Sequence, residues 1–294
     1  GPTAPATAES LSTLFLRACA EGRLEEIHDL TERLAAFRPT FEDTEPPGEN
    51  SREITATRSP RGVRLCGGPQ GPEVICLPSF VWKPSPHQYT RLASHFRGRR
   101  SLSAIDLIGF RTGDPLPSSM AALTRAMAHA VLRQADGAPF VLAGHSSGGS
   151  LAAVVARRLE EAGTPPAGLV LLDSHWWGDR TGLGSDGALL AVADTLIGND
   201  SAVSSLEEDW GDAWVTARAR YFSFDFRPET LATPTLLLRA TEPLPGASAD
   251  GAWQAAWKLP HTAVDVPGDH FSMLDAAHTE ASAEAIEDWL AGLA

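Results

Sequence analysis

The chain is organised around the stretch Pro139-Phe140-Val141-Leu142-Ala143-Gly144-His145-Ser146-Ser147-Gly148-Gly149-Ser150. An apolar run of strand length enters a Gly-x-Ser-x-Gly pentapeptide, and apolar residues at helical spacing follow it. A strand, a sharp turn and a helix in this order are typical of a nucleophile elbow, which lifts a serine hydroxyl above the edge of a sheet. Gly144 and Gly148 leave room for the close backbone approach of such a turn. The flanking pattern disfavours a chance Gly-x-Ser-x-Gly in a glycine-rich loop, so we predict that Ser146 is a nucleophile.

Length and composition indicate one large α/β domain. The chain has 294 residues, 43% of them hydrophobic, and its 24 basic and 37 acidic residues give a net charge of −13. This charge argues against nucleic acid or an anionic membrane surface as a partner, because both attract clustered Lys and Arg. The three cysteines have no paired or metal-ligand spacing, which predicts a cytoplasmic protein without a structural metal. No apolar run reaches the roughly 20 residues of a membrane span.

The first 38 residues differ in pattern from the rest. Gly1-Pro2 in place of Met is typical of a tag-cleavage remnant, so we expect a domain excised from a longer protein, with residues 1–10 as linker or tag remnant. Residues 11–38 predict two short amphipathic helices joined near Gly22. Their apolar faces pack either on the rest of this domain or on a second copy of the chain, and the pattern alone leaves both open.

From residue 39 to residue 294, apolar strands alternate with helical patterns. Strands are expected near 63–66, 73–77, 102–108, 140–145, 168–173, 234–239 and 262–266, and helices near 87–96, 118–135, after the elbow and around 285–290. This alternation predicts a mostly parallel central sheet with helices on both faces. Together with the elbow it predicts an α/β-hydrolase fold for residues 39–294.

One connection in this alternation is much longer than the others. Roughly 60 residues separate Asp173 from Thr233, far more than the few that usually link a strand to the next element. Helical patterns occur there near 188–197 and 206–222. A helical insertion at the carboxyl edge of the sheet would lie above the site, so we expect residues 178–232 to form a lid or channel wall, with a purely structural insertion as the alternative.

A serine nucleophile needs a general base, and this fold places that histidine after the last strand. The segment Val266-Pro267-Gly268-Asp269-His270-Phe271 supplies it: a strand end, a turn and then His270. His278 falls in a helical stretch, and His261 falls at the beginning of the strand, which is the wrong edge of the sheet. His145 adjoins the nucleophile, but its side chain should point away and serve a structural role. We predict that His270 is the base.

Two carboxyl groups are candidates for the acid that orients this histidine. Asp173 ends the strand after the elbow helix, and Glu242 follows the next strand in a Glu242-Pro243 loop. Both lie at carboxyl strand ends and could reach a histidine ring, although an Asp directly at a strand end is held more rigidly. Asp269 is adjacent to His270 in sequence, and adjacent side chains usually diverge. The pattern therefore favours Asp173 slightly and leaves Glu242 open.

The predicted chemistry is acyl transfer, which requires backbone donors for an oxyanion. Ser147 begins the elbow helix, so its N–H is expected to be the first donor. The second should come from the loop after the strand that ends at Leu77, which indicates the N–H of Ser79 or Phe80. Ser146 would attack a carbonyl carbon while His270 accepts and returns the proton.

Several motifs resemble those of the thioesterase domain that ends modular type I polyketide synthases, the group that releases macrolide precursors. The resemblance is carried by Pro86–Ala93, Pro115–Ala122, Gly144–Gly149, Pro165-Pro166 leading to Leu171-Leu172-Asp173, Glu242-Pro243 and Val266–Met273. These segments extend over residues 60–290, so the similarity covers most of the chain and its motifs are specific.

The resemblance implies more than the residues alone do. It maps the triad onto Ser146, Asp173 and His270, and so selects Asp173 over Glu242. It implies a homodimer through the helices of residues 11–38 and an open channel beneath the lid. It also implies a substrate carried on the phosphopantetheine arm of an acyl carrier protein domain of the same synthase, with no other cofactor.

Two departures from the family pattern affect the expected channel. The loop Phe80-Val81-Trp82-Lys83-Pro84 is bulkier than usual, and Trp176 and Trp177 follow the acid where smaller side chains are common. We expect Trp82, Trp176, Trp177 and Tyr221 to line the substrate channel. Alternatively, the tryptophans only pack the lid.

The resulting prediction is release of a full-length polyketide chain through a Ser146 acyl-enzyme. Because the channel residues are bulky, we expect hydrolysis to a linear acid, with macrolactonisation as the closest alternative. A stand-alone editing thioesterase is a weaker enzyme hypothesis, and a non-catalytic binding module should lack part of the triad. Arg97-Gly98-Arg99-Arg100 is a candidate docking patch for the carrier protein, or else a solvated helix end.

Overall fold

The computed structural model describes residues 9–42, 60–178, 211–244 and 253–293. Its central element is a seven-stranded sheet in the order β2-β4-β3-β6-β7-β8-β9, in which β2 is antiparallel to β4 and every other pair is parallel. The strands are β2 Gly62–Cys66, β3 Gln70–Leu77, β4 Arg100–Ile105, β6 Phe140–His145, β7 Gly168–Leu172, β8 Thr235–Ala240 and β9 Thr262–Val266. Short strands β1 (Thr40–Phe41) and β5 (Leu116–Pro117) pair separately. The predicted α/β-hydrolase fold is confirmed.

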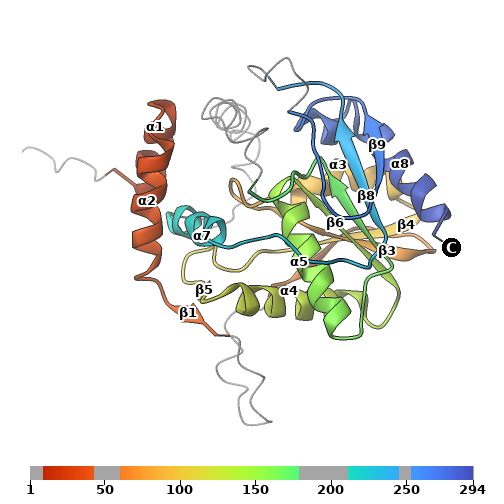
Figure 1. Ribbon diagram of the computed structural model, residues 1–294, viewed down its shortest axis with the longest axis horizontal. Coiled ribbons are helices and arrows are strands. Elements are labelled where there is room, and N and C mark those ends of the chain that lie inside the picture. Colours follow the sequence, from red (N-terminus) through yellow and green to blue (C-terminus); the bar gives the residue numbers. More distant parts are fainter. Residues whose placement is uncertain (1–8, 43–59, 179–210, 245–252, 294) are drawn as a thin grey trace, which may run out of the picture.

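Helices cover both faces of this sheet (Figure 1). Helices α4 (Met120–Ala135) and α5 (Ser147–Glu161) bury their apolar residues in one hydrophobic cluster. Helices α3 (Thr90–Phe96) and α8 (Thr279–Ala291) contribute to a second cluster. Successive residues of the inner strands alternate between the two clusters, as Leu142 and Val141 do on β6. Since both faces are covered, these strands are apolar throughout rather than alternating with polar residues.

The helices expected in residues 11–38 are α1 (Leu11–Ala20) and α2 (Leu24–Ala35). They stand to one side of the sheet, next to α7 (Ala213–Phe222) (Figure 1). Phe15 of α1 packs edge-on against Trp214 of α7, with the ring centroids 5.4 Å apart. One face of this helical pair therefore packs on its own chain.

Another face of α2 remains exposed. Leu30 is 43% exposed, Leu34 37% and Phe37 87%, and their spacing places them on neighbouring turns along one side of the helix and its end. Exposed apolar stripes of this kind are typical of interaction surfaces.

The insertion between β7 and β8 is described only in part. Helix α7 lies within the predicted segment 206–222, whereas the helix expected near 188–197 lies outside the described residues. The strand expected at 102–108 already ends at Ile105. Arg100 is buried and pairs with Glu287 at 3.0 Å, so it does not belong to an exposed docking patch. None of the described helices combines the length and the apolar character that a membrane span requires.

Candidate active site

The turn between β6 and α5 has the backbone strain expected of a nucleophile elbow. Ser146 adopts φ 56° and ψ −128°, a conformation that a serine rarely takes. The close approaches explain the glycines on either side. A Cβ on Gly144 would lie 2.3 Å from the Gly148 backbone, and a Cβ on Gly148 would lie 2.4 Å from the Leu77 carbonyl oxygen. The turn therefore holds Ser146 at the carboxyl edge of the sheet, between β3 and β7.

The same edge of the sheet carries a buried acid–base pair. His270 lies in the loop after β9, and its Nδ1 donates to Asp173 Oδ2 at 2.7 Å. Asp173 Oδ1 accepts the Ala240 N–H at 2.9 Å, so both carboxylate oxygens are used. Burial opposes ionisation of Asp173, but the hydrogen bond and charge of His270 outweigh it and lower the pKa of this carboxyl. An ionised Asp173 keeps the proton of His270 on Nδ1 and leaves Nε2 to act as a base.

The structure also separates the alternatives that the sequence left open. It brings Asp173, and not Glu242, to the histidine ring: Glu242 is exposed, while Asp173 is 4% exposed. Asp269 accepts the N–H groups of Phe271 and Ser272, so it shapes the loop that presents His270. Its side chain serves the turn rather than the imidazole.

The two predicted oxyanion donors on the loop after β3 already have acceptors. Ser79 N–H donates to the Gln88 side-chain oxygen at 3.0 Å, and Phe80 N–H donates to the Ser147 hydroxyl at 3.0 Å. The Ser79 and Ser147 hydroxyls lie 3.0 Å apart. Sequence reasoning did not anticipate these contacts. Of the two donors, only Phe80 N–H faces a side chain of the elbow itself, and that side chain can rotate.

His145 has the structural position that was expected, but it is more connected than a core histidine. Its Nε2 donates to the His270 carbonyl oxygen at 2.6 Å, and its Nδ1 lies 3.4 Å from Gln88 Nε2. The two histidine rings are 4.6 Å apart. Burial and the charge of His270 lower the pKa of His145 to about 3, so this ring is neutral at ordinary pH.

The aromatic residues expected to line a channel divide into two groups. Trp82, Trp176 and Trp177 are partly buried and pack against other aromatic rings, Trp177 against Phe80 at 5.7 Å. Tyr221 is fully buried instead, and its hydroxyl donates to the Ile108 carbonyl at 2.9 Å. Its assignment to the channel is therefore wrong: α7 is buried on nearly every side, and Tyr221 faces the core.

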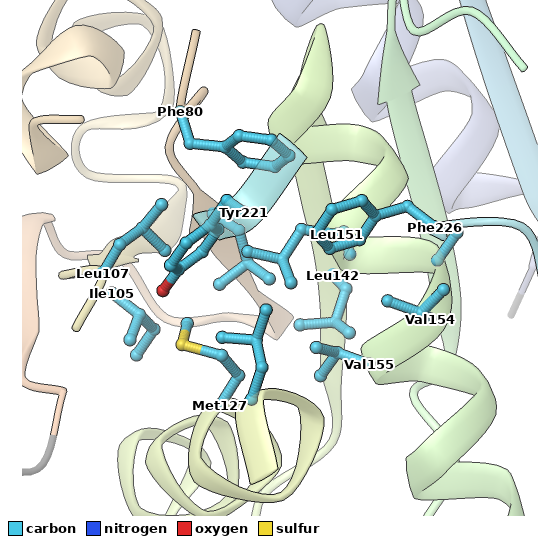
Figure 2. Packing of buried hydrophobic residues seen from close by; sticks show 14 of the residues in the cluster. Phe80, Ile105, Leu107, Met127, Leu142, Leu151, Val154, Val155, Tyr221 and Phe226 are labelled. Atoms are coloured by element: carbon cyan, nitrogen blue, oxygen red, sulfur yellow. The ribbon is translucent and has the colours of Figure 1, made fainter. Parts of the chain in front are cut away.

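Phe80 is the centre of an aromatic group that we call the Phe80 cluster: Phe80, Trp177, Tyr221, Phe222 and Phe226. Figure 2 shows the rings of Phe80, Tyr221 and Phe226 grouped around Leu151 of the elbow helix. Phe80 is fully buried within it. The loop that carries the candidate oxyanion donor is thus anchored by a large ring.

Among the described residues, one group of neighbouring side chains consists of residue types that can bind a metal ion. Candidate ligand atoms of Asp173, His175 and His270 all lie within 4.8 Å of one another. The hydrogen bond between Asp173 and His270 accounts for the closeness of two of them without an ion. A site without a metal remains a prediction.

Comparison with known proteins agrees with this geometry. The family model described as "Thioesterase domain" matches residues 72–290, a range that contains the elbow, the acid–base pair and the loop after β3. The chain belongs to the thioesterase domain family. Members of this family are enzymes of the serine-hydrolase type, and the strained Ser146 is in keeping with that chemistry.

Relatives of this chain include polyketide synthases. Polyketide synthase GfsE of Streptomyces halstedii is 40% identical over 97% of this chain, and Erythronolide synthase EryA3 of Saccharopolyspora erythraea is 33% identical over 99% of it. The chain spans only 7% and 9% of their lengths. Among solved structures, the wild-type Vlm2 thioesterase domain matches with a TM-score of 0.56 and 26% identity, over 78% of this chain and 98% of that one.

Proposed function

We propose that this thioesterase domain releases a polyketide chain from an acyl carrier protein through an acyl-enzyme on Ser146. The observation that carries the proposal is the 2.7 Å hydrogen bond between His270 and Asp173, at the same sheet edge as the strained Ser146 turn. A nucleophile on a sharp turn, a base and an acid that orients the base are the parts that acyl transfer needs.

The reaction follows in two halves. In the first, His270 Nε2 removes the Ser146 hydroxyl proton as the oxygen attacks the thioester carbonyl, and the proton then goes to the departing thiolate of the phosphopantetheine arm. In the second, His270 activates a water molecule that attacks the Ser146 ester, and the chain leaves as a carboxylic acid. Asp173 stabilises the imidazolium that forms in each half.

The oxyanion would be bound by Ser147 N–H and Phe80 N–H. Ser147 begins α5, where the first N–H groups of a helix have no acceptor within the helix and the helix dipole favours negative charge. Phe80 N–H now donates to the Ser147 hydroxyl. Rotation of that hydroxyl would exchange the acceptor, so that the oxyanion takes the place of Ser147 Oγ.

The substrate class is proposed from the relatives and from the residues around the site. GfsE is named as a polyketide synthase and EryA3 as an erythronolide synthase. We therefore infer that the substrate is a polyketide chain on a carrier protein domain. The Phe80 cluster fills space beside the oxyanion loop with large rings. A crowded wall favours an extended chain over one that folds back on the ester, so we propose hydrolysis to a linear acid.

Product analysis after a single turnover tests this proposal. The protein would be incubated with a hydroxylated acyl thioester of a small thiol, with the Ser146→Ala variant as control, and the products analysed by mass spectrometry. We expect a linear acid that is absent with Ser146→Ala. A lactone, lighter than the acid by one water, would overturn hydrolysis, and no product from several thioesters would overturn the release reaction.

We also propose that the domain is a homodimer through α1 and α2. The exposed stripe of Leu30, Leu34 and Phe37 supports this, since a second copy could cover it. Sedimentation equilibrium would test it with Leu34→Ser, using Leu293→Ser at the far end of the chain as a control of equal exposure. We expect only Leu34→Ser to shift the protein towards monomer; a monomeric parent protein would contradict the proposal.

A further inference from the structure

A chain of hydrogen bonds outside the candidate triad joins the oxyanion loop to the backbone of His270. Ser79 N–H donates to Gln88 Oε1 at 3.0 Å, Gln88 Nε2 lies 3.4 Å from His145 Nδ1, and His145 Nε2 lies 2.6 Å from the His270 carbonyl oxygen. We call this chain the Gln88 relay. It connects the loop after β3, the last residue of β6 and the loop after β9.

The direction of every bond in the relay is determined by its two ends. The His270 carbonyl oxygen can only accept, so His145 carries its proton on Nε2 and offers a lone pair at Nδ1. Gln88 must then turn its NH₂ group to Nδ1 and its oxygen to Ser79 N–H, which can only donate. One orientation of the Gln88 amide and one tautomer of His145 satisfy all three contacts. Because burial lowers the pKa of His145 to about 3, the relay keeps this polarity across ordinary pH.

The segment that carries Gln88 is itself held firmly. Gln88 belongs to a short 3-10 helix, Pro86–Tyr89, whose N-cap Ser85 accepts the His87 N–H. The next side chain, Tyr89, is fully buried; its hydroxyl donates to the Leu77 carbonyl at 2.6 Å and accepts the His145 N–H at 2.9 Å. Adjacent residues of one turn thus connect the end of β3 to the end of β6.

We propose that Gln88 is a positioning residue that keeps the oxyanion loop in register with the loop of His270. The proposal rests on the function proposed above. The bond from Ser79 N–H to Gln88 holds the loop in the conformation in which the following N–H, that of Phe80, points at the elbow. The bond from His145 to the His270 carbonyl oxygen holds the backbone of His270, and with it the position of the imidazole. Acyl transfer requires both groups around one carbonyl, and a displacement of about 1 Å costs up to about 100-fold in rate.

Replacement of the amide tests the relay. Gln88→Met keeps the length of the side chain and removes both hydrogen bonds. The control is Gln134→Met: Gln134 is also partly buried, and its amide donates to Glu73 at 3.1 Å and Ser103 at 3.0 Å, away from the elbow. The measurements are kcat/KM with a small acyl thioester, the inhibition constant of an alkyl boronic acid that forms a tetrahedral adduct on Ser146, and Tm.

We expect Gln88→Met to lower kcat/KM about tenfold or more and to weaken boronate inhibition by a similar factor, because the adduct needs the aligned oxyanion donors. Gln134→Met should affect Tm alone. Boronate inhibition and kcat/KM within twofold of the parent in Gln88→Met would overturn the proposal. Equal losses in both variants would also overturn it, since general destabilisation would then explain the effect.

If Gln88→Met does not fold, a second variant, Gln88→Glu, tests the relay instead. Gln88→Glu keeps an acceptor for Ser79 N–H but bonds to His145 Nδ1 only while the Glu–His pair retains a proton. The ionisable groups of Asp173, His175 and His270 lie nearby and are common to both proteins, so the ratio of variant to parent kcat/KM isolates the new group. Because the pKa of a glutamate is ordinarily about 4.3 and burial raises that value, we expect this ratio to fall as pH rises from about 4 to about 8, and a ratio that does not change over this range would overturn the proposal.

The two proposals fail in different ways. If the parent protein neither turns over thioesters nor binds the boronate, the proposed function fails. If the parent does both and Gln88→Met is unimpaired, only the role of Gln88 fails.

Discussion

The site has an acid–base half, made by Asp173 and His270, and an oxyanion half, made by the N–H groups of Ser79 and Phe80. The two halves differ in whether their hydrogen bonds are already those that the reaction uses. Asp173 and His270 already face each other in the arrangement that the reaction uses, 2.7 Å apart and buried. Ser79 and Phe80 have their N–H groups on Gln88 and on the Ser147 hydroxyl. The base and the acid that orients it are therefore already paired, whereas the Phe80 N–H donates to the Ser147 hydroxyl instead of to a substrate oxygen.

This difference has a physical reason. A buried carboxylate needs its partner at all times, because an unpaired buried charge is very costly. A backbone N–H needs only some acceptor, and a hydroxyl that can rotate serves until the oxyanion arrives. We therefore predict large losses when Asp173 is changed, and a small or opposite effect when the Ser147 hydroxyl, the internal acceptor of Phe80 N–H, is removed.

The largest effect is expected from removal of the nucleophile. Ser146→Ala should lower kcat by about 10⁶-fold, the loss typical when a serine hydrolase loses its nucleophile. Steady-state thioester hydrolysis measures it, with circular dichroism to show that the fold is retained. An activity loss of less than about 100-fold would indicate that another group attacks the carbonyl.

The second largest loss of activity is expected when the acid that orients His270 is changed. Asp173→Asn keeps the shape of the side chain but removes the charge that keeps the His270 proton on Nδ1, so kcat should fall by about 10⁴-fold. Glu242→Gln is the matched control, because Glu242 is exposed and was the alternative acid. If Glu242→Gln loses as much activity as Asp173→Asn, the acid is assigned to the wrong strand.

His145, which lies between the two halves, should give the stability of the protein a distinctive pH dependence. The folded ring stays neutral down to a pKa of about 3, whereas an unfolded histidine binds a proton below about 6.5. Unfolding therefore takes up a proton between these values, and the free energy of unfolding should fall by about 1.4 kcal/mol per pH unit as pH decreases from 6 to 4. Urea denaturation measures this slope.

The matched variant for that measurement is His145→Gln, which has no titrating group. Its slope between pH 6 and pH 4 should be shallower than that of the parent protein by about 1.4 kcal/mol per unit. The lowered pKa of Asp173 acts mainly below this window, because an unfolded aspartate titrates near about 3.9. Identical slopes would show that His145 is not held neutral.

The smallest effect on rate is expected at Ser147. Ser147→Ala leaves Phe80 N–H without its acceptor in the resting protein, which should reduce the free energy of unfolding by about 1–3 kcal/mol. The oxyanion restores an acceptor in the transition state, so the catalytic efficiency, kcat/KM, should stay equal or rise by less than about tenfold. If the catalytic efficiency instead fell by about 100-fold, the hydroxyl itself would act in catalysis and the two halves of the site would not differ as described.

The features that the sequence predicts well are those with a local cause. The Gly-x-Ser-x-Gly turn, the apolar strands and the position of His270 after the last strand each follow from a few neighbouring residues. The acid is harder to predict, because two strand ends offer a carboxyl group. Only the folded structure shows that Asp173 is the one that reaches the imidazole of His270. From the residues alone, Asp173 was merely favoured over Glu242.

Features that depend on tertiary contacts could not be predicted in the same way. Gln88 meets Ser79 and His145 only because a 3-10 helix places it between the ends of β3 and β6. Tyr221, which falls within the insertion between β7 and β8, is expected to line the channel, yet it packs in the core. Helix α7 carries Arg218 and Arg220 among its apolar residues, and Arg218 is itself buried, so its sequence pattern does not distinguish a buried helix from one that lines a cavity.

The most direct test of the central claim is the mass of the intact protein after brief exposure to an acyl thioester of a small thiol, followed by peptide mapping. We predict a mass increase of one acyl group in the parent protein, located on the peptide that contains Ser146, and none in Ser146→Ala. An acyl group on any other residue, or turnover without an acyl-enzyme under conditions where hydrolysis of the ester is slowed, would contradict it.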